Sequence, residues 1–315
     1  MDRREVLAGG IAASVAAITA GSSTWAATQN AAAPAPAAGK SKLMTRKIPS
    51  SGESIPVIGL GTSGPFEVGD SPQERDPLKQ LLEAFFGGGA RVIDTSPMYS
   101  TAEGVLGDLL TPAMHQQVFL ATKVWTQGRQ AGIEQMQRSV SLLKQDKLDL
   151  IQVHNLMDLP TQLTTLRQWK DEGKVRYVGI THFTVASHDD LEKVLAKEKV
   201  DFVQLNYSAF TRAAEKSLLP LAKERGVAVI VNRPYEDGRV FRKVREKPVP
   251  KWAAELGCKT WAQIFLKYII ANPAVTCVIP ATRQLQHIRD NLDAGRGELP
   301  SSRQRALILK AIAGL

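Results

Sequence analysis

The feature that most constrains the fold is an alternation of short apolar runs with longer amphipathic segments, from about residue 43 onward. The apolar runs predict strands at residues 57–62, 91–95, 118–124, 148–154, 176–181, 202–207, 228–232 and 276–280. The intervening segments predict helices, among them residues 133–144, 161–172, 187–197, 213–225 and 285–293. In the first of these helices, Ile133, Met136, Val140 and Leu143 are three to four positions apart and would share one face.

Eight such units predict an α/β fold, a (β/α)8 TIM barrel, whose usual length is about 250 residues. The predicted strands are apolar almost throughout, which is typical of a parallel sheet covered on both faces. An N-terminal β-hairpin is expected before the barrel, with strands at residues 44–48 and 54–56 around the turn Pro49-Ser50-Ser51-Gly52. A doubly wound parallel sheet is the alternative fold for the same alternation.

The N-terminal segment is predicted to be an export signal rather than part of the fold. Arg3-Arg4 is followed by Glu5 and Val6-Leu7, which resembles the twin-arginine pattern. The apolar stretch up to about Ala20 is too short and too weakly apolar for a stable membrane span. We expect a signal peptide at 1–26, recognised by the twin-arginine translocase and leading to the periplasm. An Ala/Pro-rich linker at 27–42 and the barrel at 43–315 would follow. An uncleaved anchor or a disordered extension is the alternative.

Composition argues against nucleic-acid binding and against a metal site. The formal net charge is +9, but Lys and Arg are scattered and no nucleic-acid-binding signature accompanies them. A basic surface that suits an anionic cofactor or substrate is the simpler interpretation. Cys258 and Cys277 are too few for a disulfide framework and lack metal-like spacing, so we expect two buried apolar residues and no metal site.

Four residues at or just after the ends of predicted strands carry most of the chemical information: Asp94, Tyr99, Lys123 and His154. In a barrel the carboxyl ends of the strands meet at one face, where these side chains would converge. Reduction of a carbonyl group needs a hydride on carbon and a proton on oxygen, and no side chain supplies hydride, so a nicotinamide cofactor is implied.

Each of the four would then have a distinct role. Tyr99 would donate the proton, and the Lys123 ammonium would lower the pKa of its phenol. Asp94 would hold and neutralise Lys123, while His154 would orient the carbonyl group. Taken singly, each has an ordinary structural explanation: a capping Asp, a loop Tyr, a barrel-rim Lys and a buried His. Their occurrence together on neighbouring strand ends favours the catalytic interpretation.

These residues lie in segments that resemble the aldo-keto reductase family over roughly residue 43 to the end. Asp94-Thr95-Ser96-Pro97-Met98-Tyr99, followed by Glu103 and Gly107, is similar to its signature. The segments 121–125, 152–154, 204–207 and 279–283 resemble its catalytic and cofactor-binding strands and loops. The resemblance implies an NADP-dependent carbonyl reductase with the four residues as its catalytic tetrad.

The resemblance also implies which residues bind small molecules. The cofactor-binding residues would be Thr62, Thr181, His182, Gln204, Arg233, Pro234, Tyr235, Ala281, Thr282, Arg283, His287 and Asn291. Met98 and Trp125 would line the substrate pocket, which suits an apolar or aromatic carbonyl compound better than a sugar. The segment 236–250, rich in Arg and Lys, is expected to shape that pocket.

The chain departs from the family pattern around the cofactor. Thr181-His182 replaces the usual Ser-Asn, and His182 cannot copy the paired donor and acceptor of an amide. Asn232 stands where an aromatic residue usually stacks on the nicotinamide, so either binding is weaker or Tyr235 takes that role. At the adenosine phosphate, Ala281 and His287 leave Arg283 as the candidate cation, which favours NADP(H) over NAD(H).

Three functions remain open from the sequence. The leading one is an exported carbonyl reductase that keeps its cofactor bound. A cofactor-sensing regulatory barrel is the second, although a pure sensor would not need a proton donor. The third is an alcohol dehydrogenase that works in the reverse direction with the same residues.

Overall fold

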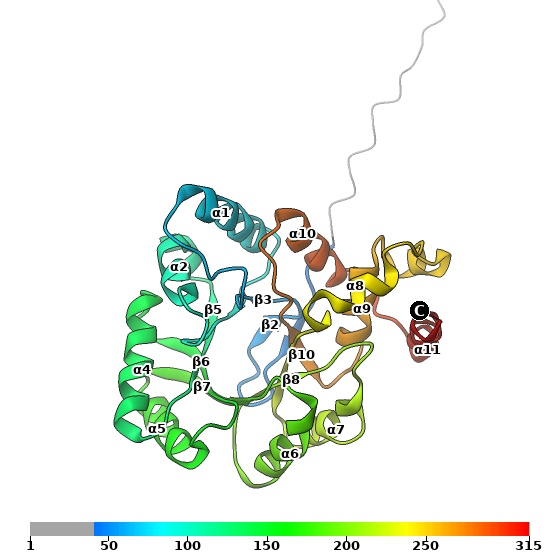
Figure 1. Ribbon diagram of the computed structural model, residues 1–315. Coiled ribbons are helices and arrows are strands. Elements are labelled where there is room, and N and C mark those ends of the chain that lie inside the picture. Colours follow the sequence, from blue (N-terminus) through cyan, green and yellow to red (C-terminus); the bar gives the residue numbers. More distant parts are fainter. Residues whose placement is uncertain (1–40, 315) are drawn as a thin grey trace, which may run out of the picture. The chain divides into compact units, whose positions relative to one another are not determined.

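The parallel strands form one barrel in the structure, a computed structural model that describes residues 41–314 (Figure 1). The described residues contain an eight-stranded parallel sheet in the order β10-β9-β8-β7-β6-β5-β4-β3. The strands are β3 (Leu60–Gly61), β4 (Val92–Asp94), β5 (Phe119–Val124), β6 (Leu148–His154), β7 (Val175–Thr181), β8 (Phe202–Asn206), β9 (Ala228–Asn232) and β10 (Val275–Val278). Parallel bridges from Ile58 to Val278 and from Gly61 to Ala281 join the first barrel strand to the last. The predicted (β/α)8 barrel is confirmed, and the doubly wound sheet is excluded.

The predicted hairpin is also present, as β1 (Thr45–Lys47) paired antiparallel with β2 (Ser54–Pro56). Its residues Ile48 and Ile55 are fully buried and belong to the same apolar cluster as Phe119, Tyr177 and Phe202 of the barrel strands. This cluster fills the barrel at the end where the strands begin. The polar side chains inside the barrel therefore gather toward the other end.

Helices surround the sheet, as Figure 1 shows. They are α1 (Pro72–Gly87), α2 (Ala102–Leu109), α3 (Pro112–His115), α4 (Arg129–Leu142), α5 (Leu159–Asp171), α6 (His188–Lys197), α7 (Leu218–Glu224), α8 (Arg239–Val244), α9 (Trp261–Ile270), α10 (Leu285–Ala294) and α11 (Ser302–Ala313). Within the described part of the chain, none of them has the length and apolar character needed to cross a membrane.

One predicted helix, residues 213–225, is interrupted. Residues Ala213–Glu215 form a 3₁₀ turn, and α7 begins only at Leu218. Ser217 between them has φ −142° and ψ −48°, outside the helical region. Pro220 explains the position of the break, because proline has no N–H group and is tolerated only in the first turn of a helix.

The segment Gly59–Gly64 has the G-x-G-x-x-G spacing of dinucleotide-binding loops, which would favour the doubly wound fold. Its first two glycines have a different role here. A Cβ atom at Gly59 would lie 2.8 Å from the carbonyl oxygen of Val92, and one at Gly61 would lie 2.9 Å from that of Ile279. These glycines let the backbone of the first barrel strand approach both neighbours closely enough to close the barrel.

The predicted signal peptide, residues 1–26, and nearly all of the predicted linker, residues 27–42, lie outside the described residues. Cys258 and Cys277 are both buried and form no disulfide in the described part of the chain. Burial raises the pKa of the Cys258 thiol to about 11. Both cysteines are therefore the buried apolar residues that the sequence predicts.

Candidate active site

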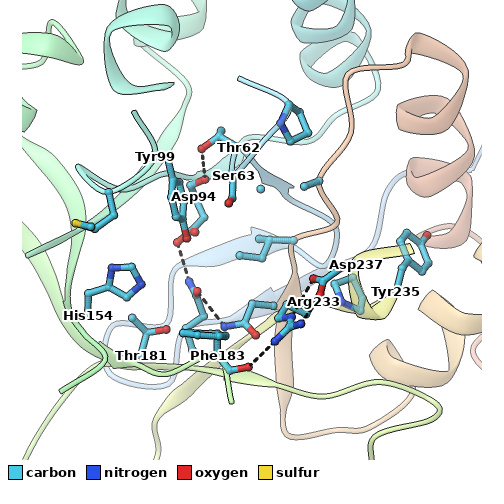
Figure 2. A pocket seen from close by; sticks show the side chains of 18 of the residues that line it. Thr62, Ser63, Asp94, Tyr99, His154, Thr181, Phe183, Arg233, Tyr235 and Asp237 are labelled. Carbon is cyan, nitrogen blue, oxygen red and sulfur yellow. Dashed lines mark hydrogen bonds and ion pairs between the residues drawn. The ribbon is translucent and has the colours of Figure 1, made fainter. Parts of the chain in front are cut away.

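A cavity of about 740 Å³ opens where the barrel strands end (Figure 2). Asp94, His154, Thr181 and Asn232 are the last residues of β4, β6, β7 and β9, and all four line it. Most sequence-predicted site residues reach this cavity: Thr62, Asp94, Met98, Tyr99, Trp125, His154, Thr181, Gln204, Arg233, Pro234, Tyr235 and Ala281. The remainder do not line it: Lys123, His182, Thr282, Arg283, His287 and Asn291.

Lys123 and Asp94 form a buried ion pair beneath the cavity. The Lys123 side chain is 0% exposed, and its Nζ donates to Asp94 Oδ2 at 2.6 Å and to the Thr95 carbonyl oxygen at 2.7 Å. Burial lowers the pKa of Lys123, but the neighbouring Asp94 and Tyr99 outweigh that effect, so the net shift is upward. Lys123 is therefore a permanent cation at neutral pH, held in place by a carboxylate.

Tyr99 lies above this ion pair in the turn that follows β4. The Lys123 Nζ is 4.9 Å from the centroid of the Tyr99 ring. Burial, the largest influence, raises the pKa of Tyr99, while Lys123 lowers it and Asp94 raises it; the net shift is upward. The predicted lowering of this pKa is therefore wrong for the protein alone, because the cost of burying a phenolate exceeds the stabilisation by the ammonium. Tyr99 is protonated at neutral pH, as a proton donor must be.

His154 faces Tyr99 across the cavity, with ring centroids 6.3 Å apart and planes at 88° (Figure 2). Its Nδ1 lies 3.4 Å from the Oγ atom of Ser96. Burial, with smaller contributions from the charges of Lys123 and His182, lowers the pKa of His154 to about 3. His154 is neutral at physiological pH and offers one N–H donor and one acceptor nitrogen.

A line of amide side chains connects Asp94 to the opposite side of the barrel. Asp94 Oδ1 accepts hydrogen bonds from Gln204 Nε2 at 2.7 Å and from Gln152 Nε2 at 3.1 Å. Gln204 Oε1 in turn accepts from Asn232 Nδ2 at 3.3 Å. Gln204 therefore has both ends of its amide engaged by other side chains.

A second polar region lies before and within the start of α10. Thr282 is buried, and its Oγ1 lies 3.4 Å from Nδ1 of His287. Arg283 and His287 are exposed, and no acidic side chain of the described residues forms an ion pair with Arg283. A helix N-terminus beside a free guanidinium is a suitable environment for a phosphate group.

Comparison with known proteins agrees with this geometry. The model of the aldo/keto reductase family matches residues 57–308. The chain belongs to the aldo/keto reductase family. It is thus an NAD(P)H-dependent oxidoreductase.

Individual relatives are similar over most of their length. The chain is 28% identical to methylglyoxal reductase YeaE of Escherichia coli over 265 residues, which is 82% of this chain and 91% of the relative. It is 23% identical to the uncharacterized oxidoreductase YqkF of Bacillus subtilis over 289 residues, 79% and 90% of the two chains. An aldo-keto reductase from Klebsiella pneumoniae, solved in complex with NADPH, has a TM-score of 0.72 at 24% identity, with 87% and 95% of the chains covered.

Two signature residues of this reductase act behind the cavity. The carboxylate of Glu103 accepts hydrogen bonds from Thr122 Oγ1 at 2.6 Å and from Ser139 Oγ at 3.0 Å. It thereby links β5, which carries Lys123, to α4. At Gly107 a Cβ atom would lie 1.9 Å from the carbonyl oxygen of Leu142, so only glycine fits there.

His182 and Arg233, two of the predicted cofactor residues, have other partners. The ring nitrogens of His182 contact Thr184 at 3.2 Å and Ser187 at 3.1 Å, and the structure does not bring His182 to the cavity. Arg233 forms an ion pair with Asp237. Its guanidinium also donates to the carbonyl oxygen of Phe183 at 3.4 Å, which connects the loops after β9 and β7 (Figure 2).

Tyr235 lies on the side of the cavity away from Tyr99 (Figure 2). Its hydroxyl donates to Asn291 Oδ1 at 2.7 Å, and its ring centroid is 4.9 Å from that of Phe241. Burial raises the pKa of Tyr235 well above its usual value. Tyr235 and Asn291 thus form one hydrogen-bonded pair, and a stacking role for Tyr235 stays a prediction.

Aromatic residues missed by the sequence interpretation widen the apolar rim of the cavity. Met98 is 42% exposed there, and Phe183 and Phe241 are 43% and 37% exposed. Phe183 follows Thr181-His182 directly, and Phe241 lies in the segment 236–250 that was expected to shape the pocket. Asp237 and Gly238 of the same segment also line the cavity. Further lining residues that were not predicted are Gly61, Ser63, Pro65, Asn155 and Ile279. No group of three or more potential metal ligands occurs in residues 41–314.

Proposed function

We propose that this reductase converts an aldehyde or ketone to an alcohol with NADP(H) as cofactor and Tyr99 as the proton donor. One observation carries the proposal: the buried Lys123–Asp94 ion pair lies directly beneath a protonated Tyr99. This arrangement suits a phenol that must give up its proton and then carry a negative charge. The lysine cation stabilises that phenolate at the moment when it forms.

The chain's own residues divide the work as follows. When bound, NADPH would supply a hydride to the carbonyl carbon and would become NADP⁺. Tyr99 transfers its hydroxyl proton to the carbonyl oxygen, which becomes the alcohol, and Lys123 stabilises the remaining phenolate. Neutral His154 donates a hydrogen bond to the same oxygen and orients the carbonyl group between the two rings. A proton from bulk solvent then converts the Tyr99 phenolate back to the phenol, which restores the residue for the next turnover.

The site fits this cofactor in two respects. A cavity of about 740 Å³ is within the usual range for cofactor sites of about 300–1,000 Å³. Arg283 has no acidic partner among the described residues, so its charge is available to an adenosine phosphate. Thr62, Thr181, Gln204 and Ala281 would border the nicotinamide half. Thr282, Arg283 and His287 would hold the phosphate half, since they lie at the N-terminal end of α10.

The test is a spectroscopic one. Purified protein is mixed with NADPH or NADH and a panel of carbonyl compounds, and the absorbance of the reduced nicotinamide is followed. The panel contains aromatic aldehydes, aliphatic ketones, sugars and methylglyoxal, since a relative is named for its reduction. We expect turnover with NADPH and a preference for apolar aromatic aldehydes over sugars, because Met98, Phe183 and Phe241 form the rim. Binding of NADPH without turnover of any carbonyl compound or alcohol would favour the sensor instead.

We further propose that the twin-arginine pattern Arg3-Arg4 directs the folded enzyme, with its cofactor bound, to the periplasm. The translocase that reads this pattern transports folded proteins, which makes export of a bound cofactor feasible. Export of a fusion with a fluorescent reporter should be abolished by Arg3→Lys together with Arg4→Lys. An unchanged distribution of the reporter would contradict the proposal. Enzyme recovered from the periplasm without bound nicotinamide would contradict cofactor retention alone.

A further inference from the structure

The amide oxygen of Asn232 has no hydrogen-bond partner within residues 41–314, although it is buried in the wall of the active-site cavity. The Asn232 side chain comes from the end of β9 and the residue is 9% exposed. A buried polar atom without a partner is costly, and nearly all such atoms are satisfied in the functional state of a protein. Oδ1 of Asn232 therefore points to a missing hydrogen-bond donor at this wall.

The orientation of the Asn232 amide follows from the charge on Asp94. A carboxylate only accepts hydrogen bonds, so Gln204 must present its NH2 group to Asp94. Gln204 Oε1 is then left to face Asn232, which must present its own NH2 group to that oxygen. Asn232 Oδ1 is consequently fixed as the free end of the chain, and it can only accept.

We propose that Asn232 Oδ1 accepts a hydrogen bond from the carboxamide N–H of the nicotinamide and positions the ring, in place of aromatic stacking. This inference rests on the proposed NADP(H) function. Gln204, whose amide is engaged at both ends, acts through Asn232 rather than on the cofactor. The carboxylate that holds Lys123 thus also sets the orientation of the group that holds the nicotinamide.

The rival acceptor on the same cavity is Asn155. Its Oδ1 also has no partner within residues 41–314, and the residue lines the cavity. Asn155 lies outside the chain of side chains from Asp94, so nothing fixes which end of its amide faces the cavity. Its φ of 53° is left-handed, so Asn155→Gly removes the amide without backbone strain. This variant is the matched control.

The experiment compares three ligands by calorimetry and by quenching of tryptophan fluorescence. They are NADP⁺, its 3-acetylpyridine analogue, whose acetyl group has no N–H, and adenosine 2′,5′-bisphosphate, which has no nicotinamide. In the wild type we expect the analogue to bind about tenfold more weakly than NADP⁺, the effect of one lost hydrogen bond. In Asn232→Leu, the two dinucleotides should bind equally, while the bisphosphate binds as in the wild type. Asn155→Gly should keep the tenfold ratio.

Three results would overturn the proposed role of Asn232, and a fourth would refute the proposed function. A wild-type ratio near one, a ratio that survives Asn232→Leu, or a ratio that is lost only in Asn155→Gly would overturn the role of Asn232. If Asn232→Leu does not fold by near-ultraviolet circular dichroism, Asn232→Ala takes its place, and the wild-type ratio stands as a test without any variant. Failure of the wild type to bind NADP⁺ at all would instead refute the proposed function.

Discussion

The Lys123–Asp94 ion pair makes a quantitative prediction about folding. Replacement of Asp94 by Asn keeps the shape of the side chain but removes the charge that neutralises a lysine of 0% side-chain exposure. Loss of one partner from a buried pair costs about 3–5 kcal/mol, because the other charge stays buried without compensation. Gln152 and Gln204 each lose an anionic acceptor as well. We therefore expect Asp94→Asn to lower the free energy of unfolding by at least about 3 kcal/mol at pH 7.

The dependence of this loss on pH provides the internal check. In the wild type the pKa of Lys123 is raised, so its contribution is fully present below the unfolded pKa and declines as pH rises through the folded value. Without Asp94, burial dominates and the pKa of Lys123 falls below its unfolded value. The penalty on Asp94→Asn should then be largest near pH 7 and shrink as pH rises toward 10.

The assay is urea unfolding followed by tryptophan fluorescence at several pH values. Adding Lys123→Met to Asp94→Asn removes the uncompensated cation and should recover most of the lost stability. The effects of substitutions on the free energy of unfolding are not additive when the two residues are in contact. Asp70→Asn is the control, because the Asp70 side chain is 94% exposed and its variant should unfold like the wild type. A cost of less than about 1 kcal/mol that does not change with pH would show that Lys123 does not depend on Asp94 for its compensation.

The other predictions concern His154 and Arg283. Because the pKa of His154 is lowered to about 3, the rate of reduction between pH 5 and 8 should show no inflection from this residue. Its unfolded form gains a proton near pH 6.5 and its folded form does not, so stability should fall by up to about 1.4 kcal/mol per pH unit below 6.5. The variant His154→Gln should show a smaller slope in acid unfolding, while His115, His182 and His188, whose pKa values are also lowered by burial, still contribute to it. An identical slope would contradict the assigned neutral state. Arg283→Ala should raise the KM for NADPH roughly tenfold, the effect of about 1.4 kcal/mol from one charged contact. The KM for NADH should not change, and an equal rise for both would place the phosphate elsewhere.

The sequence was sufficient for the fold and for the convergence of the tetrad. Strand ends of a parallel barrel share one face, so Asp94 and His154 had to meet once the strands were assigned. The sequence did not predict which hydrogen-bond partner a side chain has when several are within reach. The amide of Gln204 turns to Asp94, and His182 turns to Thr184 and Ser187, because of contacts between residues far apart in the barrel or within one loop.

The direction of the pKa shift of Tyr99 was predicted wrongly for a different reason. The sequence identifies the neighbouring ammonium of Lys123, but it does not give the degree of burial that outweighs its effect. Phe183 and Phe241 were missed because the loops after β7 and β9 fold over the cavity in a way that no periodicity encodes. The helix α8 within residues 236–250 is the element that brings Phe241 there.

A single-turnover experiment on Tyr99→Phe measures whether Tyr99 donates the proton. The substitution removes one oxygen atom and keeps the ring that lies 4.9 Å from Lys123 Nζ. The variant should therefore fold like the wild type and bind NADPH with an affinity within about twofold of the wild-type value. Tyr177→Phe removes a hydroxyl at the other end of the barrel, where it bonds to Ser51 and Glu53, and should react like the wild type. We predict that oxidation of bound NADPH by an aldehyde slows by about 10²–10⁴-fold in Tyr99→Phe. An unchanged rate in the correctly folded variant would show that another group supplies the proton.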